Sequence, residues 1–312
     1  MSARALVLVA ALAACHAAEH GSPDAAAADA GPTPLNLLFV HGVDTGAARA
    51  TAQDSLADLE AYVTARLAAH PELAVQSRRV NLYTDLDGNV LSPSIDAPSD
   101  GTGIPSALAW RRQLVAKLEQ AYPGGERDIV LIGHSTGGRA AMEVAANVGA
   151  DGQPGSFDWG VADRIAGVIT LDAILHDLES KDFNFIGPLD FISGCKLNDE
   201  AGWCEYAGLV SGAPAADAVT RDHHALVLIA AGDCSPSVWT GESDQLVPLL
   251  AQGCPAAPGT HVTPSPHGDV VAPGVFYGPF CHSDTTNKSS PRHASAIAAA
   301  GDAMATWLAA LP

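Results

Sequence analysis

The stretch "DIVLIGHSTGGR", residues 128–139, decides the expected fold. It begins as a run that is apolar on both faces, which is typical of a parallel strand buried between helices. Ser135 interrupts the pattern, and a helical spacing of apolar residues follows at 140–148. Gly133 and Gly137 stand two positions on either side of the serine, where a sharp turn needs room for close packing. The stretch therefore predicts a strand, an exposed serine on a strained turn, and a helix.

The same alternation extends along the chain. Further apolar runs of strand length, one of them weaker and alternating, lie at 35–40, 165–171, 225–231 and 75–83. Helical spacings of apolar residues lie between or after them, at 56–67, 104–122 and 297–311. Strands that alternate with helices predict an α/β fold with a doubly wound, mostly parallel sheet and helices on both faces. In such sheets ligands bind at the carboxyl ends of the strands.

The N-terminus predicts export. Residues 1–14 have a positive start and an apolar stretch too short to span a bilayer, which indicates a signal peptide. The sequence "LAAC" at 12–15 resembles a bacterial lipobox, so we expect a lipid on Cys15 and a membrane anchor; ordinary cleavage nearby is the alternative. Residues 15–34 are small, acidic and proline-containing, which predicts a disordered tether. We therefore expect a cell-envelope lipoprotein, in the outer membrane or facing the periplasm, or otherwise a secreted protein, with one domain at 35–312.

Charge and cysteine content limit the possible partners. The chain has 16 Lys and Arg against 35 Asp and Glu, a net charge of -19, with no basic cluster, so nucleic acid is not an expected partner. Five cysteines follow Cys15, and the odd number leaves one unpaired. Cys195 and Cys204 are the easiest pair, and a second bridge is contested by Cys234, Cys254 and Cys281. No C-x-x-C spacing occurs, so we expect no metal.

Two long segments interrupt the alternation. Residues 176–224 separate two strands by more than a crossover needs and contain several aromatic residues, which predicts a cap insertion. Those aromatic residues could line an acyl pocket or form a local core tied by a disulfide. Residues 84–103 predict a long loop near the carboxyl edge of the sheet. The "DLDGN" at 85–89 lacks the later glutamate of a calcium loop and is expected to be a turn.

Several motifs together resemble the α/β-hydrolase family, specifically its bacterial lipases and esterases, over about residues 35–311. They are a terminal helix after a candidate histidine, "GHSTGG" at 133–138, "FVHG" at 39–42 and "SDQLVP" at 243–248. The resemblance implies an α/β-hydrolase fold, Ser135 as the nucleophile, and no cofactor. It also implies an oxyanion hole made by the backbone N–H groups of Val43 and Thr136. No antiparallel strand pair fits before the first central strand, so a trimmed sheet is implied.

The acid and the base are expected to follow Ser135 in the order serine, acid, histidine. Asp244 follows the strand at 225–231, where the family places its acid, and its role would be to orient the histidine. Asp172 is the alternative because some lipases carry the acid one strand earlier, and Asp233 is a third candidate. These alternatives stay open at the level of sequence.

The base is expected at His282, with His293 and His267 as alternatives. His282 follows an apolar stretch and neighbours Cys281, which could pin it beside the acid loop by a bridge to Cys234. His134 is expected to line the pocket, and His223 and His224 are expected to be solvated.

The predicted function is therefore hydrolysis of carboxylic esters, with lipid or other apolar acyl esters as substrates. An acyl-enzyme would form on Ser135. One alternative is an acyltransferase that uses the same residues. Another is a non-catalytic surface lipoprotein that uses the fold to bind a ligand.

Overall fold

The computed structural model describes residues 31–42, 47–91, 107–173, 175, 213–230, 254–255 and 273–311. The chain divides into two units, Met1–Gly31 and Pro32–Pro312, and the elements below belong to the second. The predicted signal peptide, Cys15 and most of the predicted cap lie outside the described residues.

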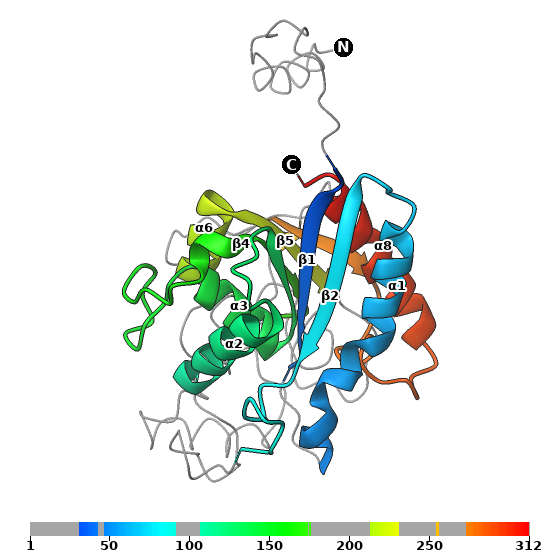
Figure 1. Ribbon diagram of the computed structural model, residues 1–312. Helices are drawn as coiled ribbons and strands as arrows, with labels where there is room; N and C mark the ends of the chain where they lie inside the picture. Colours follow the sequence, from blue (N-terminus) through cyan, green and yellow to red (C-terminus); the bar gives the residue numbers. More distant parts are fainter. Residues whose placement is uncertain are drawn as a thin grey trace, which may run out of the picture. The chain divides into compact units, whose positions relative to one another are not determined.

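A sheet of seven strands forms the centre of this unit, in the order β2-β1-β3-β4-β5-β7-β6 (Figure 1). The strands are β1 (Thr33–Val40), β2 (Leu73–Val80), β3 (Ile129–His134), β4 (Ile165–Leu171), β5 (His224–Ala230), β6 (Cys254–Pro255) and β7 (Pro273–Gly278). All neighbouring strands run parallel. The predicted doubly wound α/β class is confirmed.

Helices cover both faces of the sheet. They are α1 (Ala57–Leu67), which continues a 3-10 helix (Ala47–Leu56), α2 (Ala107–Ala121), α3 (Thr136–Ala145), a short 3-10 turn (Ala162–Arg164), α6 (Ala213–Asp222) and α8 (His293–Ala309). Helices α1 and α8 lie on one face, and α2, α3 and α6 lie on the other (Figure 1). On each face, the helices and the sheet enclose a hydrophobic core between them.

Strand β1 shows why the sequence reads as a continuous apolar run. Leu38 and Val40 pack in the core under α2, α3 and α6. Leu37 and Phe39 point the opposite way and pack under α1 and α8. Because successive side chains alternate between two buried faces, positions 37–40 are all apolar. The buried Asn36 is accommodated because its side-chain amide donates a 2.8 Å hydrogen bond to the Arg127 carbonyl oxygen.

Several elements differ from the sequence-based expectation. Residues 213–222, inside the predicted insertion 176–224, form α6 and contribute Ala216 and Val219 to the core, so this part belongs to the helical layer of the sheet. The apolar stretch before His282 forms strand β7, and the two-residue strand β6 has no counterpart among the predicted strands. Strand β2 ends at Val80 rather than at residue 83, since the chain then turns toward the loop that follows.

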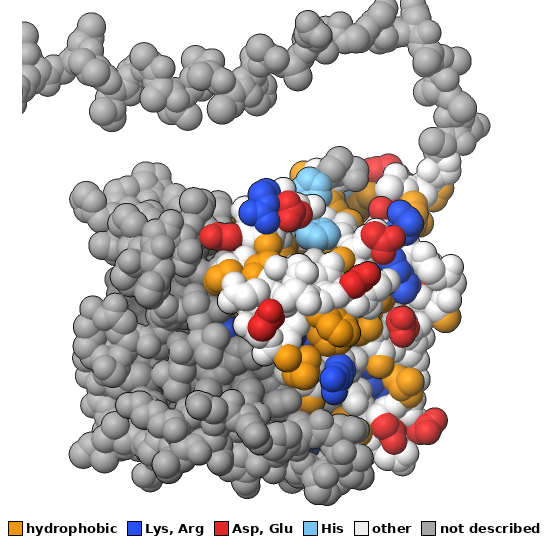
Figure 2. Space-filling view, turned by 90° about the vertical axis from the view of Figure 1, so that its left-hand side faces the viewer, with side chains coloured by type: hydrophobic (Ala, Val, Ile, Leu, Met, Phe, Trp, Pro, Cys, Tyr) orange, Lys and Arg blue, Asp and Glu red, His pale blue; other side chains and the backbone are white. Residues whose placement is uncertain are grey.

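The surface of the described residues mixes charges of both signs. Figure 2 shows acidic and basic side chains beside each other, between apolar and neutral ones, on the part of this face that is described. Among the described residues, no helix is both long enough and apolar enough to cross a membrane.

Candidate active site

Ser135 lies on the turn between β3 and α3, at the carboxyl edge of the sheet. Its position on the turn is as predicted, but the residue is buried, 8% exposed, rather than exposed. Its backbone has φ 54° and ψ -126°, a conformation that side-chain-bearing residues seldom adopt. Its N–H donates a 2.9 Å hydrogen bond to the carbonyl oxygen of Leu171, the last residue of β4. The neighbouring strand therefore holds the strained turn in place.

The glycines around Ser135 are required by close backbone contacts. A Cβ atom on Gly137 would lie 2.2 Å from the carbonyl oxygen of His41, and one on Gly133 would lie 2.4 Å from the Cα of Gly138. Gly42 is crowded in the same way, since its Cβ would lie 2.8 Å from the Cβ of Ser135. The steric role expected for Gly133 and Gly137 is confirmed, and the turn after β1 packs directly against the serine.

Three buried side chains gather beside this turn. His134 ends β3, Asp172 directly follows β4, and His282 follows β7, so each belongs to the carboxyl edge. One nitrogen or oxygen of each lies within 4.8 Å of those of the other two. Asp172 is fully buried and has a positive φ of 53°, which indicates a second constrained backbone at the site.

His134 binds the main chain of His282. Its Nε2 atom lies 2.9 Å from the carbonyl oxygen of His282, and because a carbonyl only accepts, Nε2 carries the proton and donates. The two rings are 4.8 Å apart. Burial, and next the neighbouring His282, lowers the pKa of His134 to about 3, so the ring is neutral at ordinary pH.

Asp172 has a donor from the next strand but one. The Tyr277 hydroxyl, on β7, donates a 2.7 Å hydrogen bond to Asp172 Oδ2. A hydrogen bond to an ionised carboxylate stabilises its charged form. The bond also links the end of β4 to the strand that leads to His282.

His41 fixes the turn after β1. Its Nε2 accepts a 2.9 Å hydrogen bond from the Leu82 N–H, so the proton is on Nδ1, which lies 2.6 Å from the Gly42 carbonyl oxygen. The ring stacks on Tyr83 at 5.2 Å and meets Trp110 edge-on at 5.7 Å. This turn is therefore rigid where it contacts Ser135.

Of the residues predicted for the site, Ser135, Thr136 and His282 come from the same edge of the sheet. Thr136 is the first residue of α3, where a helix presents free N–H groups to an anion. His293, an alternative base, begins α8 and pairs with Asp58 on α1, its Nε2 lying 3.0 Å from Asp58 Oδ2. The other predicted residues lie outside the described part of the chain: Val43, Asp233, Asp244, His267 and Cys15.

Sequence reasoning missed the roles of His134 and Tyr277. His134 is also a hydrogen-bond donor to the segment that carries His282, a role that the sequence did not indicate. The sequence did indicate Asp172 as a candidate acid, because it directly follows the apolar run of β4. The choice between Asp172 and Asp244 depends on tertiary contacts, which the sequence does not show. Cys281 takes part in a disulfide bond, and the predicted pairing with Cys234 stays a prediction because Cys234 lies outside the described residues.

Within the described residues, His134, Asp172 and His282 are also the group that could hold a metal ion. Their ligand atoms all lie within 4.8 Å of one another. His134 Nε2 donates its N–H to the carbonyl oxygen of His282, so only Nδ1 of this ring could bind a metal ion.

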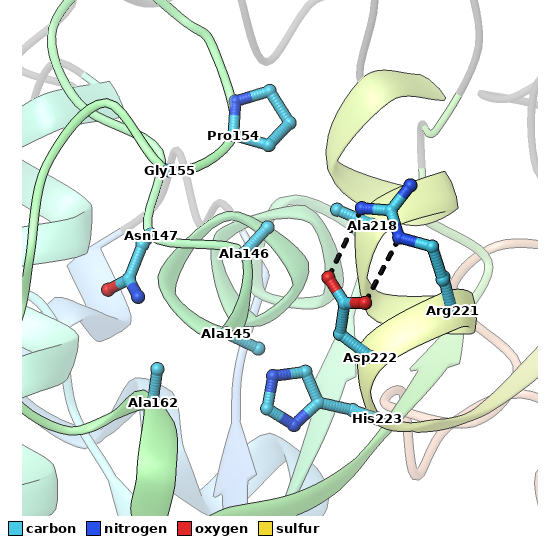
Figure 3. A pocket seen from close by; sticks show the side chains of 10 residues that line it. All are labelled: Ala145, Ala146, Asn147, Pro154, Gly155, Ala162, Ala218, Arg221, Asp222 and His223. Atoms are coloured by element: carbon cyan, nitrogen blue, oxygen red, sulfur yellow. Dashed lines mark hydrogen bonds and ion pairs between the residues drawn. The ribbon is translucent and has the colours of Figure 1, made fainter.

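A separate cavity of about 270 Å³ lies near the opposite, amino end of β4 and β5 (Figure 3). Arg221 and Asp222 on its rim pair with each other at 3.0 and 3.1 Å and so neutralise one another. His223 Nδ1 donates to the Ile165 carbonyl oxygen at 2.9 Å. The remaining lining is mostly small side chains and backbone, so its chemistry differs from that around Ser135.

Comparisons with known proteins found no matching family model and no matching curated protein. Solved structures do align. A hydrolase from Oleispira antarctica aligns with TM-score 0.47 and 10% identity, covering 89% of this chain and 92% of that one. An α/β hydrolase from the metagenome of Mar Chica lagoon sediments aligns with TM-score 0.44 and 11% identity, covering 89% and 91%. A thermophilic esterase from Thermogutta terrifontis aligns with TM-score 0.43 and 14% identity, covering 89% and 90%.

The fold itself is that of the α/β hydrolases. A parallel, doubly wound sheet carries a strand–serine–helix turn at its carboxyl edge, with further candidate residues on loops after later strands. This confirms the fold expected from the sequence. The activity has to be argued from the geometry of the site.

Proposed function

We propose that this chain is a serine hydrolase that cleaves carboxylic esters through an acyl-enzyme on Ser135. The observation that carries the proposal is the strained turn at Ser135, with φ 54° and ψ -126°, beside buried Asp172 and His282. A sharp turn lifts a serine hydroxyl clear of its own backbone, and a histidine and a carboxylate nearby supply the base and its partner. A binding module has no need of this combination.

The proposed reaction proceeds in two stages. The Ser135 oxygen attacks the ester carbonyl carbon while its proton passes to His282, which then returns the proton to the departing alcohol. Water attacks the acyl-enzyme with His282 again as the base, which releases the acid and restores Ser135. The Thr136 N–H, at the start of α3, would stabilise the oxyanion, with the Val43 N–H as the second donor expected from the sequence.

We propose Asp172 as the acid, in place of Asp244. Its side chain lies within 4.8 Å of a His282 ring nitrogen, and the Tyr277 hydroxyl stabilises its charge. The comparison of Asp172→Asn with Asp244→Asn tests this choice. We expect the first variant to lose on the order of 10⁴-fold in kcat, by analogy with other triads, and the second to lose far less. The reverse order would return the role to Asp244.

The function itself is tested by Ser135→Ala and by labelling with a fluorophosphonate. We expect wild-type protein to hydrolyse p-nitrophenyl butyrate and to be labelled at Ser135. We expect the variant to lose labelling and at least about 10³-fold in kcat. Wild-type activity in folded Ser135→Ala, or wild-type protein that is neither active nor labelled, would overturn the proposal.

The preference for lipid or other apolar esters stays a proposal that rests on the sequence of residues 176–212, outside the described chain. A series of p-nitrophenyl esters with acyl chains of increasing length tests it, and a kcat/KM that falls steadily with chain length would contradict it. The lipid anchor on Cys15 is likewise a proposal. Cys15→Ser is expected to move the protein from the membrane fraction to the soluble fraction.

A further inference from the structure

The loop between β7 and α8, which carries His282, is organised around one buried carboxylate. Asp284 is only 3% exposed. Its Oδ2 accepts a 2.7 Å hydrogen bond from the backbone N–H of Cys281, and its Oδ1 accepts one from the Ser290 hydroxyl. Arg292 adds an ion pair, with Nε 3.1 Å from Asp284 Oδ2. The carboxylate therefore joins both ends of the loop.

Arg292 also forms hydrogen bonds to the segment just before His282. Its Nη2 atom donates to Cys281 Sγ at 2.7 Å, and its Nη1 atom donates to the Pro279 carbonyl oxygen at 3.4 Å. On the other side, the carbonyl of His282 is held by His134. The main chain is thus fixed immediately before His282 and at His282 itself.

A buried carboxylate is costly unless it is paired, so this arrangement is stable only because the Asp284 oxygens meet an N–H, a hydroxyl and a guanidinium. Hydrogen bonds to a charged acceptor are about twice as strong as neutral ones. Such bonds restrict the loop more than an apolar side chain would, and proton transfer from serine to histidine tolerates little displacement.

We propose that Asp284 is a positioning residue for the hydrolytic reaction. Its carboxylate holds the Cys281 main chain and thereby sets the imidazole of His282 relative to Ser135. The inference rests on the proposed function, in which His282 is the base. Asp284 acts through the loop and takes no part in proton transfer itself.

Asp284→Asn keeps the shape of the side chain and removes its charge, so it tests the proposal. With p-nitrophenyl butyrate we expect kcat to fall about 10-fold or more, because a misplaced base slows the chemical step, while KM stays within about 2-fold. Labelling of Ser135 by a fluorophosphonate should slow in proportion to kcat. A purely structural role would lower the melting temperature without this change in kcat for the folded protein.

Asp302→Asn is the matched control. Asp302 on α8 also pairs with an arginine, Arg66, at 2.9 Å, but it joins α8 to α1 away from the loop. Its kcat and labelling rate should match those of the wild type. If Asp284→Asn fails to fold, Arg292→Gln replaces it, since this side chain is 40% exposed and its loss is better tolerated.

The outcomes separate the two proposals. Wild-type protein that is inactive and unlabelled overturns the proposed function. Active, labelled wild-type protein together with a folded Asp284→Asn, or Arg292→Gln in its place, of unchanged kcat overturns the positioning role alone. The positioning role is also overturned if Asp284→Asn and Asp302→Asn lose kcat to the same extent.

Discussion

The Nε2–H group of His134 donates a 2.9 Å hydrogen bond to the backbone carbonyl oxygen of His282. These residues are 148 positions apart in the chain. One directly precedes the proposed nucleophile, and the other is the proposed base. The bond therefore joins the segment that carries the proposed nucleophile to the main chain of the proposed base.

Replacement of His134 tests the importance of this bond. His134→Gln keeps an N–H donor near the position of Nε2, whereas His134→Leu leaves the buried carbonyl of His282 without it. We expect kcat to fall up to about 10-fold in the leucine variant, as the loss of a hydrogen bond worth about 1 kcal/mol or somewhat more predicts, and less in the glutamine variant. Steady-state kinetics on the two folded proteins measure this. Equal values for both variants would contradict the donor role.

His134 also predicts how stability depends on pH. Its pKa is lowered from 6.5 to about 3 by burial, so the unfolded chain binds a proton below pH 6.5 that the folded chain does not bind until about pH 3. The free energy of unfolding is therefore unaffected by His134 above pH 6.5. Between pH 6.5 and about pH 3 it falls by about 1.4 kcal/mol for each pH unit. Urea unfolding at pH 7.5 and 5.0 measures it. Wild type should lose about 2 kcal/mol more than His134→Gln between these values; identical losses would be inconsistent with a buried neutral ring.

Tyr277→Phe removes the hydroxyl that donates to Asp172. We expect kcat to fall several-fold, because a hydrogen bond to a charged group contributes about 1.5–3 kcal/mol and its loss weakens the hold on the carboxylate. The matched control is Tyr62→Phe, since the Tyr62 hydroxyl donates to Asp302 between α1 and α8. Its kcat should be unchanged. The prediction fails if both variants lose activity to the same extent.

A buried ion cluster joins α3 to α2, and we expect its disruption to lower the stability of the fold strongly. Glu143 Oε2 on α3 lies 2.6 Å from Arg111 Nη1, and Glu143 Oε1 lies 2.8 Å from Arg139 Nε. All three side chains are at most 2% exposed. Glu143→Gln should lower the free energy of unfolding by about 3–5 kcal/mol, since it removes a negative charge that is buried against two guanidinium groups.

The matched control for this cluster is Asp222→Asn, which breaks the exposed pair with Arg221. Because this pair is exposed to solvent, its loss should leave the free energy of unfolding close to that of the wild type. Urea unfolding of the two variants makes the comparison, and a Glu143→Gln protein as stable as Asp222→Asn would show that the buried cluster contributes no more than the surface pair.

The sequence predicted what depends on local pattern. The turn at Ser135 was predictable because a strand, two spaced glycines and a helix lie within one short stretch, and the close contacts of Gly133 and Gly137 confirm the reason. Helix α6 was missed because its buried face is made mainly of alanine, which gives a weak apolar period.

The partners of the site could not be predicted in the same way. The position of Asp172 beside His282 depends on sheet order, which brings the ends of β4 and β7 to the same edge as β3. The donation from His134 to His282 depends on which way a single buried ring faces, and no periodicity encodes that. Long-range geometry of this kind appears only in the folded chain.

The strand order also has a consequence for biosynthesis. β1 is made first, yet it lies between β2 and β3, and Asn36 is paired with Ile129. A ribosome must therefore have passed residue 134 before β1 has both neighbours, and β7 with His282 is made later still. Because such distant pairings close slowly, we expect a nascent polypeptide to lack the proposed activity until the segment that carries His282 has been made.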